Sequence, residues 1–228
     1  MISVIIPALN EEREIARTIV CALAMEEVGE VIVVDGGSQD GTVGIARAMG
    51  AAVVECERGR GRQMHAGALA ASGEVLWFVH ADTRPESGAT RQIVAALGDA
   101  LVVGGNCTLA FDGETRGARL LNAVQPLMKR LGVYYGDSTI FVRRSVYCAA
   151  GGCRPYPLFE DSDLIQRVRA LGRFVSLDAR VVTSSRRFEQ RGFLRTCFLW
   201  TSLQMLFWCG VPAERLGKWY APVRRDTV

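Results

Sequence analysis

Short apolar runs divide the first eighty residues at regular intervals, and this pattern predicts buried β-strands. The runs are rich in β-branched residues and lack the polar alternate positions of a strand with one solvated face. Each is followed by a helix-forming segment or by glycines. The predicted strands cover residues 3–9, 30–37, 51–56 and 74–81.

The segments between these runs predict helices over residues 10–24, 40–50 and 61–72. In the first, Ile15, Ile19 and Leu23 recur at helical spacing, and Asn10 is the expected N-cap. Asp40 is expected to open the second helix and Gly50 to close it. The order β-α-β-α-β-α-β is typical of an α/β fold with a mostly parallel central sheet and helices on both faces.

Beyond residue 100 the pattern is less regular. It predicts a strand over 101–111, a helix over 117–132 that Pro126 bends, and a helix over 160–172 between two further strand segments at 139–152 and 173–184. The first of these strand segments leads into a short helix, and the tail from 196 to 228 is expected to be helical and basic. Because there is no linker or repeat, we expect a single domain spanning 1–228.

Composition and charge exclude several classes of protein. With 49% hydrophobic and 22% charged residues the chain is globular rather than disordered, and a net charge of +3 is too small to argue for nucleic-acid binding. Positive charge is nevertheless concentrated between residues 180 and 225, with nine Lys or Arg against two Glu. Such a region suits an anionic ligand or an anionic membrane surface, and a solvated basic face is equally compatible.

The cysteines and the N-terminus predict a cytoplasmic protein. Seven cysteines without a CxxC pair indicate reduced thiols, and the N-terminal segment "MISVIIPALNEE" lacks the basic region of a signal peptide. Residues 196–213 carry no charge but include polar residues and end at Gly210 and Pro212, so they predict a buried or interfacial helix rather than a membrane span. We expect its aromatic part, 198–209, to mediate peripheral membrane contact or self-association.

Polar residues follow three of the predicted strands directly. Asn10, Asp35 and Asp82 lie at the carboxyl ends of the first, second and fourth strands. In parallel α/β sheets these ends meet at one edge, where ligands bind. The sequence therefore predicts a binding site there.

Four motifs bear on its chemistry. "VVDGGSQDGT" (33–42) forms a turn with exposed N–H groups that suits a nucleotide, or is a turn and helix cap only; it does not match the dinucleotide or P-loop fingerprints. The carboxylate of "HAD" (80–82) suits Mg²⁺ or Mn²⁺. "FEDSDL" (159–164) offers acids that cap a helix or act as a general base. "SSRRFEQRG" (184–192) groups arginines that suit diphosphate oxygens or a solvated loop.

Taken in order, "SVIIPALNEE", "VVDGGSQDGT", "FVHADTRP" and "FEDSDL" resemble the family 2 glycosyltransferases of the GT-A fold over nearly the whole chain. "GRGRQMHAGALAASGEVLWFVHADT", "GDSTIFVRRS" and "SSRRFEQRG" are similar to a bacterial subgroup called transferase 2 of the radical-SAM/selenodomain-associated type. The resemblance implies an inverting transfer of sugar from a nucleoside-diphosphate sugar, commonly UDP-linked, to an unidentified small-molecule or lipid acceptor. It also implies a nucleotide-binding half (1–105) and an acceptor half (106–195).

The resemblance also implies roles for individual residues. The acid at Asp161 is the expected general base, with Glu160 beside it, and the acid at Asp82 is the expected ligand of Mg²⁺ or Mn²⁺ on the diphosphate. Asp35 is expected to contact the nucleotide base. The full set of expected nucleotide-binding residues is Pro7, Ala8, Asn10, Glu11, Asp35, Gly36, Arg62, Ala81 and Arg186.

One position departs from the family pattern. His80 stands where the first acid of an Asp-x-Asp element is expected. A neutral imidazole can ligate Mn²⁺ but is a poor ligand for Mg²⁺, so His80 either completes the metal site or only fills space beside the strand. Two other readings stay open: a nucleotidyltransferase, disfavoured because "PALNEE" has no glycine-rich basic loop, and a nucleotide-binding module without turnover that docks to a membrane or partner.

Overall fold

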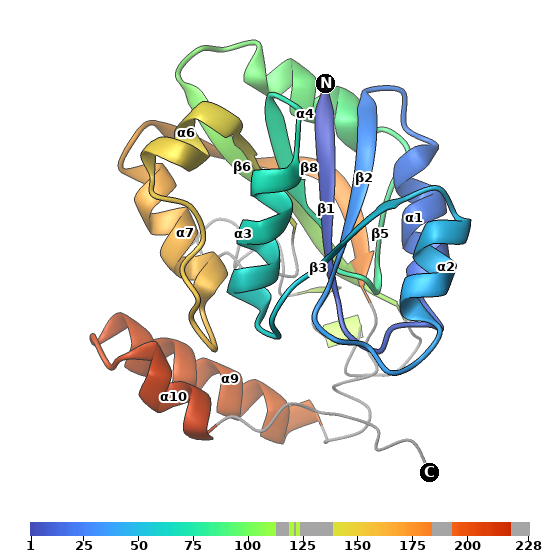
Figure 1. The fold of residues 1–228 in the computed structure, drawn as a ribbon. Helices are drawn as coiled ribbons and strands as arrows, with labels where there is room; N and C mark the ends of the chain where they lie inside the picture. Colours follow the sequence, from blue (N-terminus) through green and yellow to red (C-terminus); the bar gives the residue numbers. More distant parts are fainter. Residues whose placement is uncertain (113–118, 121, 124–138, 184–192, 220–228) are drawn as a thin grey trace.

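The structure is a computed structural model that describes the chain except residues 113–118, 121, 124–138, 184–192 and 220–228 (Figure 1). The strands are β1 (Ile2–Ala8), β2 (Val28–Asp35), β3 (Ala52–Glu55), β4 (Val75–Phe78), β5 (Thr83–Pro85), β6 (Val102–Phe111), β7 (Ile140–Arg143) and β8 (Arg173–Thr183). The helices are α1 (Ile15–Leu23), α2 (Thr42–Ala48), α3 (Arg60–Ala70), α4 (Ala89–Leu97), α6 (Arg144–Ala149), α7 (Glu160–Arg169), α9 (Phe193–Trp208) and α10 (Ala213–Trp219).

The strands form one sheet of eight, in the order β3-β2-β1-β4-β7-β6-β8-β5. Strands β3, β2, β1 and β4 are parallel, as the alternation of strands and helices predicts. Ala8 is level with Asp35, and Ile5 with Phe78, so β1, β2 and β4 end at the same edge. Strand β7 lies antiparallel between β4 and β6, while β6 and β8 are again parallel. The sheet is therefore mostly parallel, as predicted.

Helices cover both faces of the sheet, and alternate residues of β1 contribute to two separate cores (Figure 1). Val4 and Ile6 belong to the core shared with α1, α2 and α4, whereas Ile5 belongs to the core shared with α3, α6 and α7. All three side chains are fully buried. This explains why the strand is apolar at every position, since neither face of it is solvated.

The prediction that Asn10 caps the first helix is wrong. Helix α1 begins at Ile15 with Glu14 in the N-cap position, and Asn10 has a φ of 55° in the loop before it. Asn tolerates the left-handed region better than most residues because its short polar side chain can bond locally. Here the side-chain oxygen accepts a hydrogen bond from the Gln39 amide, in the loop after β2. Because of this tertiary contact the helix begins further along the chain, at Ile15. Gly50, by contrast, ends the second helical segment at φ 84°, as predicted.

The fourth strand is shorter than predicted, and two elements after it were not predicted. Strand β4 ends at Phe78, and His80 to Thr83 form a turn closed by the Thr83 amide, which donates to the His80 carbonyl at 3.1 Å. The chain then forms β5, which pairs antiparallel with β8, and helix α4. Strand β5 has only three residues, too few for periodicity to reveal.

In the second half, β6, β7 with α6, α7 and β8 confirm the predicted elements. The predicted helix over 117–132 falls mostly outside the described residues. Within the tail that the sequence predicts to be helical, the described residues form helices α9 and α10, which lie side by side below the sheet (Figure 1). They form a third apolar cluster, in which Leu203 and Leu216 pack with Leu158 and Phe159. None of the described helices combines the length and apolar character needed to cross a bilayer.

Candidate active site

Asp35 ends β2 and organises the turn that follows it. Its Oδ2 accepts hydrogen bonds from the amides of Gly37 and Ser38, both at 2.9 Å. Only 3% of the residue is exposed, and within the described part of the chain Oδ1 is buried without a hydrogen-bond partner. A buried carboxylate oxygen left unpaired is costly, so this atom is a candidate contact for a ligand.

Gln63, which the sequence did not single out, fastens α3 to this edge. Its Nε2 donates to the carbonyls of Ala8 at 2.7 Å and Val34 at 2.8 Å, and the side chain is buried. Gly36 lies beneath this amide, and a Cβ there would stand 3.1 Å from it. The ends of β1 and β2 and the start of α3 are thus held as one unit.

The loops after β1 and β2 are bonded to each other. The backbone amide of Asn10 donates to the Ser38 hydroxyl at 2.9 Å. The side-chain oxygen of Asn10 accepts from the backbone amide of Gln39 at 2.8 Å. The Glu11 amide donates to the Thr42 hydroxyl, also at 2.8 Å. The predicted nucleotide-binding residues Asn10 and Glu11 therefore lie beside the loop of Asp35, as the meeting of strand ends requires.

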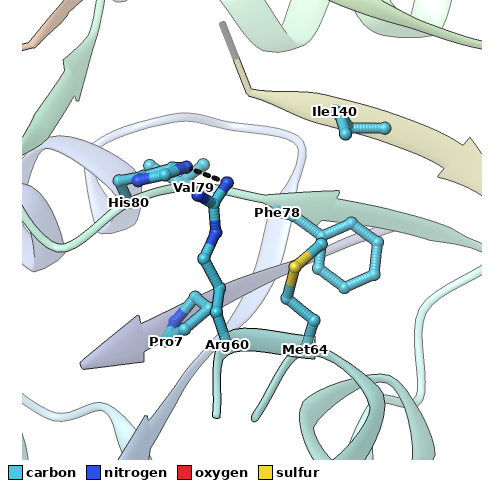
Figure 2. Close-up of a pocket in the computed structure, with 7 residues that line it drawn as sticks. All are labelled: Pro7, Arg60, Met64, Phe78, Val79, His80 and Ile140. Carbon is cyan, nitrogen blue, oxygen red and sulfur yellow. Dashed lines mark hydrogen bonds between the residues drawn. The ribbon is translucent and has the colours of Figure 1, made fainter. Parts of the chain in front are cut away.

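A pocket opens at the end of β4 (Figure 2). The Arg60 guanidinium, from the start of α3, and the His80 ring are its polar groups, and Arg60 Nη2 lies 2.6 Å from His80 Nε2. The other lining residues are Pro7, Met64, Phe78, Val79 and Ile140. The pocket is small, and it combines apolar walls with two polar groups.

Arg60 also joins this pocket to the acids of α7. Its Nε lies 2.9 Å from Glu160 Oε1, and its Nη2 lies 3.3 Å from Asp161 Oδ2. Both carboxylates are mostly buried, with side-chain exposures of 4% and 11%. They stand in the first turn of α7, where the helix dipole favours negative charge. The predicted base Asp161, its neighbour Glu160 and His80 therefore meet at one guanidinium.

The third acid of "FEDSDL" has a different environment. Asp163 accepts from Arg154 Nη1 at 3.0 Å and from Arg167 Nε at 3.0 Å. Arg167 also donates to the carbonyl of Gly152 at 2.8 Å, which ties α7 to the preceding loop. Glu160 and Asp161 thus contact the arginine of the pocket, whereas Asp163 holds the helix in place.

A buried thiol and a phenol lie beside the acids. The Cys153 amide donates to the Tyr147 hydroxyl at 2.9 Å. Burial, with a smaller effect of the Glu160 charge, raises the pKa of the Cys153 thiol to about 12. Burial is also the main cause that raises the pKa of the Tyr147 hydroxyl. Both groups stay neutral at physiological pH and add no charge to the site.

The donor set can be compared with what a divalent cation needs. No three His, Cys, Asp or Glu side chains of the described residues form a group that could enclose a metal. Mg²⁺ often binds through one or two protein carboxylates and completes its shell with water and substrate phosphates. The half-buried Asp82, in the turn after β4, fits that mode of binding. A metal held there with a diphosphate is compatible with the residues present.

Three further predicted site residues are Ala81, Arg62 and Arg186. The Ala81 carbonyl accepts from the Thr18 hydroxyl at 2.7 Å, which fixes the turn to α1. Arg62 pairs with Glu57, and both side chains are largely exposed. Arg186 lies outside the described residues. The arginine in the pocket is Arg60, which the sequence did not single out and which is the first residue of α3.

A family model described as glycosyl transferase family 2 matches residues 3–158. The chain belongs to glycosyl transferase family 2. An uncharacterized glycosyltransferase of Mycobacterium tuberculosis and one of Mycobacterium bovis are each 36% identical to it over 98 residues. The matched part is 42% of this chain and spans only 43% of each relative's length.

Solved structures with a similar fold cover a larger share of the chain than these relatives do. Glucosyl-3-phosphoglycerate synthase from M. tuberculosis, in complex with Mn²⁺, UDP-glucose and phosphoglyceric acid, is similar with a TM-score of 0.67 and 24% identity, over 93% of this chain and 80% of that one. TarS 1–349 of S. aureus is similar with a TM-score of 0.64 and 20% identity, over 81% and 60%. These likenesses confirm the predicted GT-A fold.

Proposed function

We propose that this family 2 member transfers a sugar, with inversion, from a UDP-linked donor to a hydroxyl acceptor. The observation that carries the proposal is the meeting of His80 with Glu160 and Asp161 at Arg60. The strand edge to which we assign the diphosphate thereby lies next to buried acids suited to activating a nucleophile. Transfer of a sugar from the donor needs diphosphate binding and activation of the nucleophile side by side.

The donor half of the proposal rests on the loops of β1 and β2. The glucosyl-3-phosphoglycerate synthase of similar fold was crystallised with UDP and Mn²⁺, and in another crystal with Mg²⁺. In this chain we assign the nucleotide base to the edge at Asp35, whose buried Oδ1 has no partner in the described part of the chain. Asp82 would hold the divalent cation, which, when bound, neutralises charge on the leaving diphosphate.

The chemical step assigned to this chain's residues is a single displacement. The acceptor oxygen forms a bond to the anomeric carbon while the bond from that carbon to the diphosphate oxygen breaks, and its electron pair leaves with the diphosphate. The acceptor proton passes to the Asp161 carboxylate as general base. The 11% exposure of that side chain limits the water that could compete as nucleophile.

We also propose that residues 1–105 form the donor half and 106–195 the acceptor half of one domain. The elements at the donor edge, β1 to β4 and α3, all fall in the first range, and α7 falls in the second. The narrower resemblance to the radical-SAM/selenodomain-associated subgroup stays a prediction.

Substitution of Asp161 by Asn tests the proposal. The amide keeps the size of the side chain but cannot accept a proton, so sugar transfer is expected to fall by about 100-fold or more. UDP binding, measured by calorimetry with Mn²⁺, is expected to persist. Transfer at the wild-type rate would show that Asp161 is not the base, and loss of UDP binding would place Asp161 in the donor site instead.

A further inference from the structure

Arg60 has three charged or polar neighbours from distant parts of the sequence. Its guanidinium contacts His80 at 2.6 Å, Glu160 at 2.9 Å and Asp161 at 3.3 Å. One third of its side chain, 34%, remains exposed, whereas the two carboxylates are mostly buried. Arg60 and the half-buried His80 are therefore the members of this cluster that a ligand entering the pocket can reach, and Arg60 is the one that carries a fixed positive charge.

The chemistry of the groups fixes the direction of the contact with His80. A guanidinium only donates hydrogen bonds and stays charged, so Nε2 of His80 must be the acceptor. The lone pair of that nitrogen is then directed at Arg60. His80 as a metal ligand through Nε2 stays a prediction, and it would require Arg60 to move away.

The packing of α3 fixes where the guanidinium can be. Arg60 is the first residue of α3, and the next residue, Gly61, lies so close to the loop before α7 that a Cβ would stand 2.1 Å from the Arg154 carbonyl oxygen. Gln63 bonds the same turn to the ends of β1 and β2. Arg60 is thus held between the strand edge and α7.

We propose that Arg60 binds the donor's diphosphate and screens it from Glu160 and Asp161. This inference rests on the proposed function, because it requires a nucleoside-diphosphate donor. An anionic leaving group at Arg60 would otherwise come close to the two carboxylates that this arginine contacts. A guanidinium between them can donate to phosphate oxygens and remain near the acids, as its planar array of N–H groups allows.

The test compares UDP with UMP, since the two nucleotides differ by one phosphate. Binding of each is measured by calorimetry with Mn²⁺ to the wild type and to Arg60→Ala, Arg60→Lys and Arg173→Ala. For Arg60→Ala we expect UDP to bind about 10- to 100-fold more weakly and UMP to change by less than about threefold, because charge-assisted hydrogen bonds to the second phosphate are lost. Arg60→Lys, which keeps the charge, is expected to bind UDP better than Arg60→Ala.

Arg173→Ala is the matched control. Arg173 is also a partly exposed arginine paired with an aspartate, Asp99, but it begins β8 and lies away from the pocket residues. We expect it to bind UDP and UMP as the wild type does. Should Arg60→Ala fail to fold, as judged by its thermal unfolding, Arg60→Gln removes the charge with less loss of packing and replaces it in the same comparison.

The outcomes separate this inference from the proposed function. If the wild type binds UDP and Arg60→Ala binds it equally well, the inference is overturned while the donor site stands. If Arg60→Ala weakens UDP and UMP by the same factor, the effect does not come from the diphosphate and the inference is also overturned. If the wild type binds neither nucleotide, the proposed function fails and the inference falls with it.

Discussion

At the scale of single residues, the charge of the site depends on which buried groups stay neutral. Glu160 and Asp161 both pair with Arg60. Cys153 lies next to them and is buried, and the pKa of its thiol is raised to about 12. Burial is the main cause, and the charge of Glu160 adds to it. A thiolate there would sit beside two carboxylates, so folding keeps the thiol protonated.

This pKa shift predicts how stability depends on alkaline pH. The thiol ionises near pH 9 in the unfolded chain but near pH 12 in the folded one, so its contribution is fully present below pH 9 and is lost as the pH rises towards 12. The loss approaches about 1.4 kcal/mol per pH unit. Urea unfolding at pH 8 to 11 should show a shallower decline for Cys153→Ala than for the wild type. Parallel declines would contradict the shift.

The sequence predicts some residues of the site better than others, for a physical reason. Asp35, Asp82 and Asp161 follow a strand or begin a helix, and such positions are readable because buried apolar runs mark where strands end. Arg60 and Arg62 lie in one alternating basic run. Which of them faces α7 depends on the position where α3 begins and on its packing, and neither is written in the local pattern.

At the scale of elements, α3 is the part that joins the two halves of the site. Gly61 allows its first turn to approach the loop before α7, and Gly67 allows its middle to approach the sheet, where a Cβ would stand 2.4 Å from Ile5. Phe159 supports the other side. It precedes α7 at φ 63° and stacks on Phe207 of α9 with ring centroids 4.9 Å apart. Strained backbone of this kind persists where packing determines it.

Alanine at Gly61 tests this role of α3. A Cβ at 2.1 Å from the Arg154 carbonyl oxygen forces the helix or the loop to move, so the free energy of unfolding is expected to fall by about 2 kcal/mol. Gly44→Ala is the matched control, because Gly44 also lies in a helix, α2, but its Cβ would meet nothing within 4 Å. There we expect a gain of about 0.5 to 1 kcal/mol. Urea unfolding measures both, and equal effects would contradict the account.

The elements also show where periodicity is insufficient. The strands β1 to β4 and the helices between them are predicted because each is a continuous apolar or amphipathic segment. The start of α1 was placed five residues too early, because the bonds of Asn10 to the loop of β2 are long-range. Strand β5 exists only through its pairing with β8. Contacts distant in sequence decide these features, and a local pattern does not contain them.

At the scale of the whole molecule, the apolar layer of α9 and α10 lies next to the site. Its inner side packs on Phe159, directly before the acids, while Phe198, Met205, Trp208 and Trp219 are more than half exposed. The predicted membrane contact or self-association of 198–209 stays a prediction. Flotation with anionic lipid vesicles tests the membrane contact, and light scattering tests self-association. If the protein neither floats with the vesicles nor associates with itself, both predictions are wrong.

The central claim is that this fold transfers a sugar, and the products formed from a nucleotide donor test it most directly. Incubated with UDP-glucose and related UDP-sugars, Mn²⁺ and a panel of hydroxyl acceptors, the protein is expected to release UDP, and Asp161→Asn is expected to release little. Pyrophosphate formed from UTP and a sugar phosphate would instead indicate a nucleotidyltransferase. Tight UDP binding without consumption of any donor would contradict the account and leave a binding module.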